Sequence, residues 1–377
     1  MRKEFPGYYL PTDKEFKEIW ETCDFSFDAN VLLNLYRYTK DTRQVLIKTL
    51  KSVEDRIWIP HQTALEYHRN RIHVIETQLN AYEKIKKILT DQKTATISML
   101  TQVYQNGKHP YINSDKFQRE LTRLTDEYLS ELDQLKEFHP NLIYDDPIKD
   151  ELTELFEGKV GDHFDSEETE EILKKGKERY EKEIPPGYMD NHKGSPERYG
   201  DLILWFQIIK HAKERNKPII FVTDDRKEDW WYRPYNKTIG PRPELISEIV
   251  FEAEIKFYMY SADPFMSRAE QYLNQKIDEQ AINEVEKLRK FDEEQTFDFS
   301  RLTQAQNELM RNMVTPDFSR LAQVQNELMR NMVTPDFLRL AQAQNELMSN
   351  QNQTTQNSDI PEANIEDNST NEKSDEQ

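Results

Sequence analysis

The sequence predicts an α/β fold built on a mainly parallel β-sheet, and three observations support this. Four short apolar or alternating runs predict strands, at 23–28, 56–60, 218–223 and 255–261. Helical apolar spacing lies between these runs, so strands and helices alternate along the chain. A charged share of 32%, an aromatic share of 11% and only 9 glycines indicate a helix-rich protein with a substantial core.

Each strand has its own signal. The stretch CDFSFD, 23–28, alternates apolar and polar residues, and RIWIP, 56–60, is closed by a proline. The run PIIFVT, 218–223, is apolar over four residues and leads directly into the paired aspartates Asp224 and Asp225. The helix YGDLILWFQIIKHAKERNK, which precedes it, has more apolar residues than one face needs and should be well buried.

Residues 76–185 differ in character and predict a helical arm inserted into the fold. Apolar residues recur three and four apart on both sides of the turn NGKHPYINS, which indicates two long antiparallel helices with a coiled-coil-like seam. A third, highly charged helix is expected at 166–184. The pattern does not choose between a substrate clamp, a dimer seam and a docking site for another protein.

The regions outside this fold also have distinct signatures. Three near-identical 19-residue units begin at Phe299, Phe318 and Phe337, and each is a plausible short amphipathic helix. We therefore expect a segmented chain, with these parts: an N-terminal segment 1–22, an α/β domain 20–262 interrupted by the arm, a helical linker 263–298, the repeats 299–350 and a disordered acidic tail 351–377.

Composition excludes several classes of protein. The single cysteine, Cys23, rules out an intramolecular disulfide framework and a cysteine-built zinc site. The N-terminal stretch lacks the apolar run of a signal peptide, and LILWFQII is far too short to span a bilayer, so we expect a cytoplasmic protein without a membrane partner. The net charge of −19 is unusual for nucleic-acid binding, although 66–71 and 210–217 are locally basic.

Four acidic residues are expected at one edge of the sheet. Asp28 and Asp224 each follow a strand, Glu66 lies early in the helix after the second strand, and Asp201 begins the helix before the third. Functional groups of parallel α/β sheets gather beyond the carboxyl ends of the strands. Crowded carboxylates repel one another, and a hard divalent cation, Mg²⁺ or Mn²⁺, relieves that repulsion.

Each acid also has a structural explanation. Asp28 is a suitable N-cap for the next helix, and Asp201 could serve only as a partner for the helix dipole. Glu66 could be a solvated acid that pairs with Arg69. The adjacent Asp224 and Asp225 could both be turn formers.

Five motifs in order carry a resemblance to a known family: FSFDANVLLNLYRY, IWIPHQTALEYHRNR, IPPGYMDNHKG, YGDLILW and FVTDDRKEDWW. Together they resemble the PIN domain, and more closely its bacterial PIN-like branch with a TDD…DWW ending. The resemblance covers roughly 20–262 and implies a three-layer fold with a metal-dependent nuclease site, often acting on RNA. It assigns catalytic and metal-binding roles to Asp28, Glu66, Asp201 and Asp224, with Asp225 assisting or replacing Asp224.

The resemblance also suggests auxiliary residues. Asn30 and Thr223 match polar residues beside the metal in that family, whereas Asp190, Lys193 and Arg69 are expected substrate or auxiliary contacts. The leading hypothesis is a metal-dependent nuclease, with RNA favoured over DNA as its substrate. A possible protein partner or self-association would involve the arm or the repeats. The alternatives are a catalytically inactive adaptor that binds nucleic acid or protein, and a phosphatase-like hydrolase of small phosphoesters.

Overall fold

The computed structural model of the 377-residue chain describes residues 1–106, 113–273 and 275–293. The expected repeats, 299–350, and the expected acidic tail, 351–377, lie outside the described residues.

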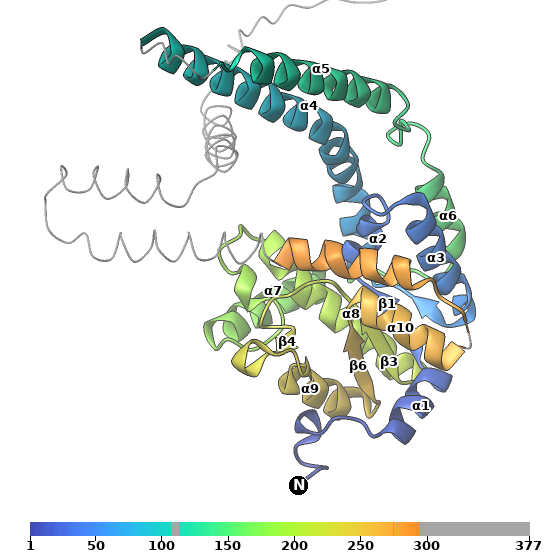
Figure 1. Cartoon of the computed structure of the whole chain (residues 1–377). Coiled ribbons are helices and arrows are strands. Elements are labelled where there is room, and N and C mark those ends of the chain that lie inside the picture. Colours follow the sequence, from blue (N-terminus) through green and yellow to red (C-terminus); the bar gives the residue numbers. More distant parts are fainter. Residues whose placement is uncertain (107–112, 274, 294–377) are drawn as a thin grey trace, which may run out of the picture. The chain divides into compact units, whose positions relative to one another are not determined.

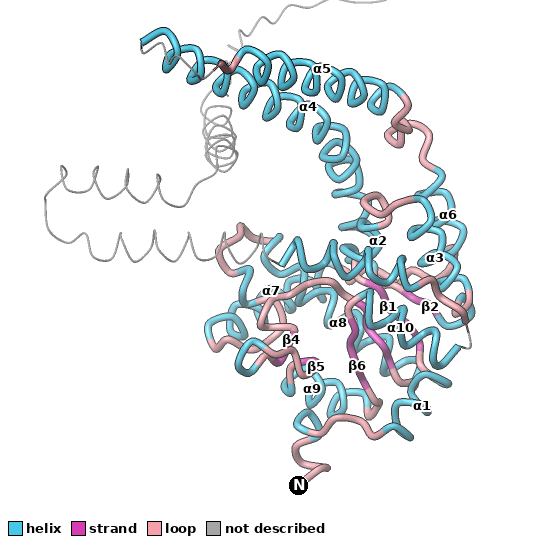
Figure 2. Tube along the Cα trace, in the orientation of Figure 1, coloured by secondary structure: helices cyan, strands magenta, loops and turns pink. Residues whose placement is uncertain are grey.

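A four-stranded parallel sheet forms the centre of the fold (Figures 1 and 2). Its strands, in spatial order, are β2 (Ile57–Trp58), β1 (Asp24–Phe27), β3 (Ile219–Val222) and β6 (Phe257–Tyr260). These are the four strands that the sequence predicts, and all three pairings are parallel. Phe27 is in register with Val222, so the residues that follow these two strands emerge at the same edge.

Helices cover both faces of the sheet because apolar side chains alternate between the faces. Phe25 and Phe27 belong to a core that also contains residues of α1 (Asp13–Thr22), α3 (Lys40–Lys51) and α10 (Ala262–Leu273). Phe221 belongs to the opposite core, with residues of α8 (Gly200–Arg215) and α9 (Pro243–Ala253). This three-layer arrangement, with a mainly parallel sheet in the middle, is the predicted fold class.

The arm is continuous with the α/β fold, because one helix belongs to both. The helix α4 (His61–Asn106) has 46 residues; its first turns contact the core, where Ile75 is buried, and its far part lies beside α5 (Asp115–Glu137) (Figure 1). Ion pairs Lys86–Asp133 and Lys93–Asp126 run in opposite order along the two helices, as expected for antiparallel neighbours. The helix α4 begins at residue 61, and the arm expected from residue 76 is its continuation.

Further elements complete the described part. The remaining helices are α2 (Ala29–Asn34), α6 (Pro147–Phe156), α7 (Ser166–Glu181) and a helix at 279–293; β4 (Trp231–Tyr232) and β5 (Gly240–Pro241) form a small antiparallel pair. Short 3-10 helices lie at Pro6–Tyr8, Glu54–Arg56, Tyr188–Asp190, Glu197–Tyr199 and Pro234–Asn236. The sequence patterns identified α7 but neither α6 nor the β4–β5 pair.

Asp146 joins the arm to the α/β layers and should be a major determinant of stability. Its buried carboxylate accepts hydrogen bonds from the Tyr36 hydroxyl at 2.8 Å and from the Lys149 backbone N–H at 2.9 Å, and it pairs with Arg71. Removing one partner of a buried ion pair leaves the other charge uncompensated. We expect Asp146→Ala to lower the free energy of unfolding by about 3 kcal/mol. Urea denaturation measures this, and Asp145→Ala, at an exposed neighbour, is the matched control.

Candidate active site

Asp28 lies at the carboxyl edge of the sheet, where β1 passes into α2. Its backbone N–H still donates to the Val222 carbonyl at 2.9 Å, so the β1–β3 pairing continues up to this residue. One carboxylate oxygen accepts the Ala29 N–H at 2.7 Å and thereby caps α2. The capping interpretation is confirmed, and the cap leaves a role in a site open, because it uses only part of the carboxylate's capacity to accept hydrogen bonds.

Thr223 and Asn30 position the carboxylate of Asp28. The Thr223 hydroxyl donates to Asp28 Oδ2 at 2.6 Å, and the Asn30 amide donates to the same oxygen at 2.7 Å. Thr223 Oγ1 also accepts the backbone N–H of Asp225 at 3.0 Å. One buried hydroxyl thus connects the ends of the two central strands and fixes Asp28 relative to Asp225.

Glu66 and Asp201 reach the same place from two helices. Glu66 lies on the second turn of α4, and Asp201 is the second residue of α8. A Cβ added at Gly200 would lie 2.9 Å from Glu66 Oε1, so this carboxylate sits directly against the beginning of α8. A side chain at position 200 would therefore displace the Glu66 carboxylate from its present place.

Lys227 lies among the acids of the site, although little in its sequence context marks it as a site residue. Its ammonium is 3.0 Å from a carboxylate oxygen of each of Asp190, Asp201 and Asp225. The only signal in the sequence is position, two residues after Asp225 in TDDRK, where a turn can direct the side chain back toward the strand ends. Lys227 N–H also donates to Asp225 Oδ1 at 2.8 Å, which closes that turn.

Asp224, predicted to lie with the other acids, has hydrogen-bond partners of its own. One of its oxygens accepts the Ala262 N–H at 2.9 Å, at the first residue of α10, and the other accepts the Asn34 amide at 3.0 Å. Asp225 instead contacts the ammonium of Lys227 at 3.0 Å, so the two adjacent aspartates have different partners. The structure directs Asp225 to the site and Asp224 to the packing of α2 and α10.

The loop 184–194 supplies Asp190 and is held by a buried acid. Asp229 Oδ2 accepts the backbone N–H groups of Gly187 at 2.8 Å and Met189 at 3.1 Å. Gly187 has φ +93°, and an added Cβ would meet the Tyr180 hydroxyl at 2.2 Å, so a side chain is excluded there. Asp190 is buried, which fits a role inside the site.

Two further expected contacts lie at the surface. Lys193 is exposed, with its ammonium 2.8 Å from Asp190 Oδ2, and Arg69 is exposed on α4, three residues after Glu66. Both charged groups are therefore accessible to solvent.

The electrostatics of the group show an excess of negative charge. Burial, followed by repulsion from Glu66, raises the pKa of Asp28 to about 8, although the Thr223 hydrogen bond acts in the opposite direction. Burial likewise raises the pKa values of Glu66 and Asp201. Burial also acts to raise the pKa of Asp190, but Lys227 and Lys193 hold it below its ordinary value. Lys227 and Lys193 therefore offset the effect of burial at Asp190, whereas the pKa values of Asp28, Glu66 and Asp201 stay raised.

Comparison with known proteins identifies the fold family. A family model described as a PIN-like domain matches residues 25–245, more than half of the chain. The chain belongs to the PIN-like domain family. No curated protein and no solved structure gives a significant match. PIN-like domains are generally nucleases that use divalent metal ions, and the matched range contains every acid described above.

The acids of this PIN-like domain suit a hard divalent cation in donor type and in charge. Carboxylate oxygens are the ligands that Mg²⁺ and Mn²⁺ prefer. Burial is the main cause of the raised pKa of Asp28, and repulsion from Glu66, which a cation would offset, adds to it. Within residues 1–106, 113–273 and 275–293, however, no three Asp, Glu, His or Cys side chains are already arranged as a ligand set. Three of the carboxylates are turned toward Lys227, so a cation would require some of them to change partners.

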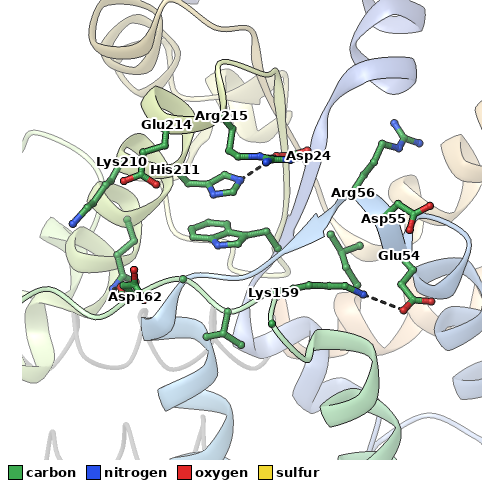
Figure 3. A pocket seen from close by; sticks show the side chains of 16 residues that line it. Asp24, Glu54, Asp55, Arg56, Lys159, Asp162, Lys210, His211, Glu214 and Arg215 are labelled. Carbon is green, nitrogen blue, oxygen red and sulfur yellow. Dashed lines mark hydrogen bonds and ion pairs between the residues drawn. The ribbon is translucent and has the colours of Figure 1, made fainter.

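A pocket at the opposite end of the PIN-like sheet has different chemistry (Figure 3). Its volume is about 360 Å³, and it includes Asp24, the first residue of β1. The buried Asp24 carboxylate contacts His211 at 3.1 Å, Lys217 at 3.2 Å and Arg215 at 3.3 Å, and although burial opposes this, His211 and Lys217 keep its pKa below the ordinary value. This acid already has its counter-charges, so the pocket is not a second acidic site.

Among the described residues, no helix is both long enough and apolar enough to cross a membrane.

Proposed function

We propose that the chain is a metal-dependent nuclease that hydrolyses phosphodiester bonds and acts on RNA in preference to DNA. The observation that carries this proposal is the convergence of Asp28, Glu66, Asp201 and Asp225 at the carboxyl edge of the sheet, with the pKa of Asp28 raised to about 8. Mutually repelling carboxylates are costly to maintain, and a cation-binding role accounts for that cost. The preference for RNA rests on the resemblance to the PIN family.

The proposed ligands are Asp28, Glu66, Asp201 and Asp225, and the ion is Mg²⁺ or Mn²⁺. When bound, the ion would increase the acidity of the attacking water and offset charge on the phosphoryl group. The chain's own part is positional: Thr223 and Asn30 fix Asp28, and the first turns of α4 and α8 fix Glu66 and Asp201. The water oxygen forms a bond to phosphorus and loses a proton as the bond to the leaving oxygen breaks, and the leaving oxygen takes up a proton.

Cations at the edge of the site would contact the substrate. Lys193 is exposed beside Asp190, and Arg69 is exposed on α4, so we assign both to phosphate binding. Such contacts position the backbone without reading sequence. Self-association or protein binding through the arm or the repeats stays a prediction.

Cleavage of labelled single-stranded RNA and DNA in Mn²⁺ or Mg²⁺ tests the proposal. We expect the wild type to cut RNA only with the ion present, and Asp201→Asn and Glu66→Gln each to reduce the rate by at least about 100-fold. Unchanged secondary structure by circular dichroism is the control for folding. Full activity in Asp201→Asn would remove that residue from the site. A folded wild type that binds nucleic acid but cuts none, under any ion, would favour the adaptor alternative.

A further inference from the structure

The acidic residues of the site fall into two sets, according to whether their partner is an ammonium or a neutral hydrogen-bond donor. Asp190, Asp201 and Asp225 all face the ammonium of Lys227 at 3.0 Å, and their side chains are at most 18% exposed. Asp28 instead accepts hydrogen bonds from the neutral donors Ala29, Asn30 and Thr223, and Glu66 accepts one from the neutral amide of Gln62. One half of the group therefore has a positive charge in its centre, whereas the hydrogen-bond donors of the other half are neutral.

The ammonium is held as a structural part of the site. Three carboxylates surround it, its side chain is 27% exposed, and the turn that carries it is closed by the Lys227 N–H to Asp225 hydrogen bond. Lys193, by contrast, is 47% exposed and contacts only Asp190 among these acids. An ammonium is a compact point charge, and its three N–H donors match the three acceptors around it.

We propose that Lys227 takes the position that a second cation would otherwise occupy, so that the chain binds a single divalent ion, on the side of Asp28 and Glu66. This inference rests on the proposed metal-dependent function and deepens it. A divalent ion and an ammonium repel each other strongly inside a site with little water, so a second ion cannot enter the position between Asp190, Asp201 and Asp225 that the ammonium occupies. Asp201 and Asp225 each have a second carboxylate oxygen, so both remain ligands of the single ion. Two-metal sites place their ions close together to balance the charge of the attacking and leaving oxygens, and here the lysine supplies one of the two charges.

The test is a count of bound Mn²⁺ by isothermal titration calorimetry on the full chain, with equilibrium dialysis as a second method. We expect the wild type to bind one ion per chain and Lys227→Met to bind two. Lys227→Gln provides a second neutral variant if the first does not fold, as judged by circular dichroism. Lys193→Met is the matched control, because it removes a lysine from Asp190 but leaves the central ammonium, and it should still bind one ion.

Two ions in the wild type, or no ion, would overturn the inference, and so would a single ion in both folded Lys227 variants. Cleavage assays on the same preparations keep the two proposals separate. One ion without cleavage of any nucleic acid would count against the nuclease proposal and leave the role of Lys227 standing. Two ions with cleavage would do the opposite.

Discussion

Asp28→Asn is expected to abolish cleavage and, at the same time, to stabilise the metal-free protein near and above pH 8. Asparagine keeps an oxygen that can accept the Ala29 N–H, so the cap on α2 is retained. It removes a buried charge that faces Glu66, Asp201 and Asp225; burial first, and then repulsion from these acids, raises the pKa of Asp28 to about 8. We expect a loss of activity of at least about 100-fold.

The two pKa values of Asp28, unfolded and folded, determine whether its contribution to stability rises or falls with pH. An unfolded aspartate titrates near roughly pH 3.9, whereas Asp28 in the folded protein titrates near 8. Between these values the folded state binds more protons than the unfolded state, so the stability that this group contributes is present below about pH 4 and is lost as the pH rises through 8. Asp28→Asn removes this slope.

Chemical denaturation of the metal-free protein at pH 5, 7 and 9 measures the effect. The variant should gain on the wild type as the pH rises, by more than about 1 kcal/mol at the upper end. Asp165→Asn is the matched control, because Asp165 also caps a helix, α7, but lies on an exposed surface. Equal pH slopes for wild type and Asp28→Asn would contradict the prediction, as would unchanged cleavage.

The sequence predicts the sheet because its signals are local. CDFSFD alternates, PIIFVT is continuously apolar, and a proline closes RIWIP, so each strand can be recognised without knowledge of its neighbours. The parallel order places the carboxyl ends of β1, β2 and β3 at one edge, and Glu66 and Asp201, from two helices, are among the charges that act on Asp28. The short β4–β5 pair has two-residue strands, which are too brief for any periodic pattern.

The details of the site depend on where individual side chains point, and the hydrophobic periodicity of the sequence does not encode this. Asp224 and Asp225 are identical residues in one turn, and only tertiary partners, Ala262 and Asn34 for one and Lys227 for the other, separate their roles. Lys227 itself has an ordinary sequence context, and its importance arises from Asp190 and Asp201, which come from a distant loop and helix. A single sequence could not indicate that convergence.

These two neighbouring aspartates provide the sharpest separation of function from folding. Asp225→Ala should reduce cleavage by at least about 100-fold and change stability little, because Lys227 keeps Asp190 and Asp201 as partners. Asp224→Ala should lower the free energy of unfolding by about 2 kcal/mol, since it leaves the Ala262 N–H and the Asn34 amide without their acceptor. Below its melting transition, the folded fraction of Asp224→Ala should retain much of its activity.

Cleavage rates and denaturation curves of the two variants, measured side by side, decide the assignment, and each variant is the control for the other. The two changes remove the same chemical group one residue apart. A difference between the variants therefore reflects the different contacts of the two carboxylates and not the loss of a carboxylate as such. A stable but inactive Asp224→Ala would return that residue to the catalytic group. An active Asp225→Ala would show that the acid nearest Lys227 is not needed for hydrolysis, and the ligands would then have to come from Asp28, Glu66 and Asp201.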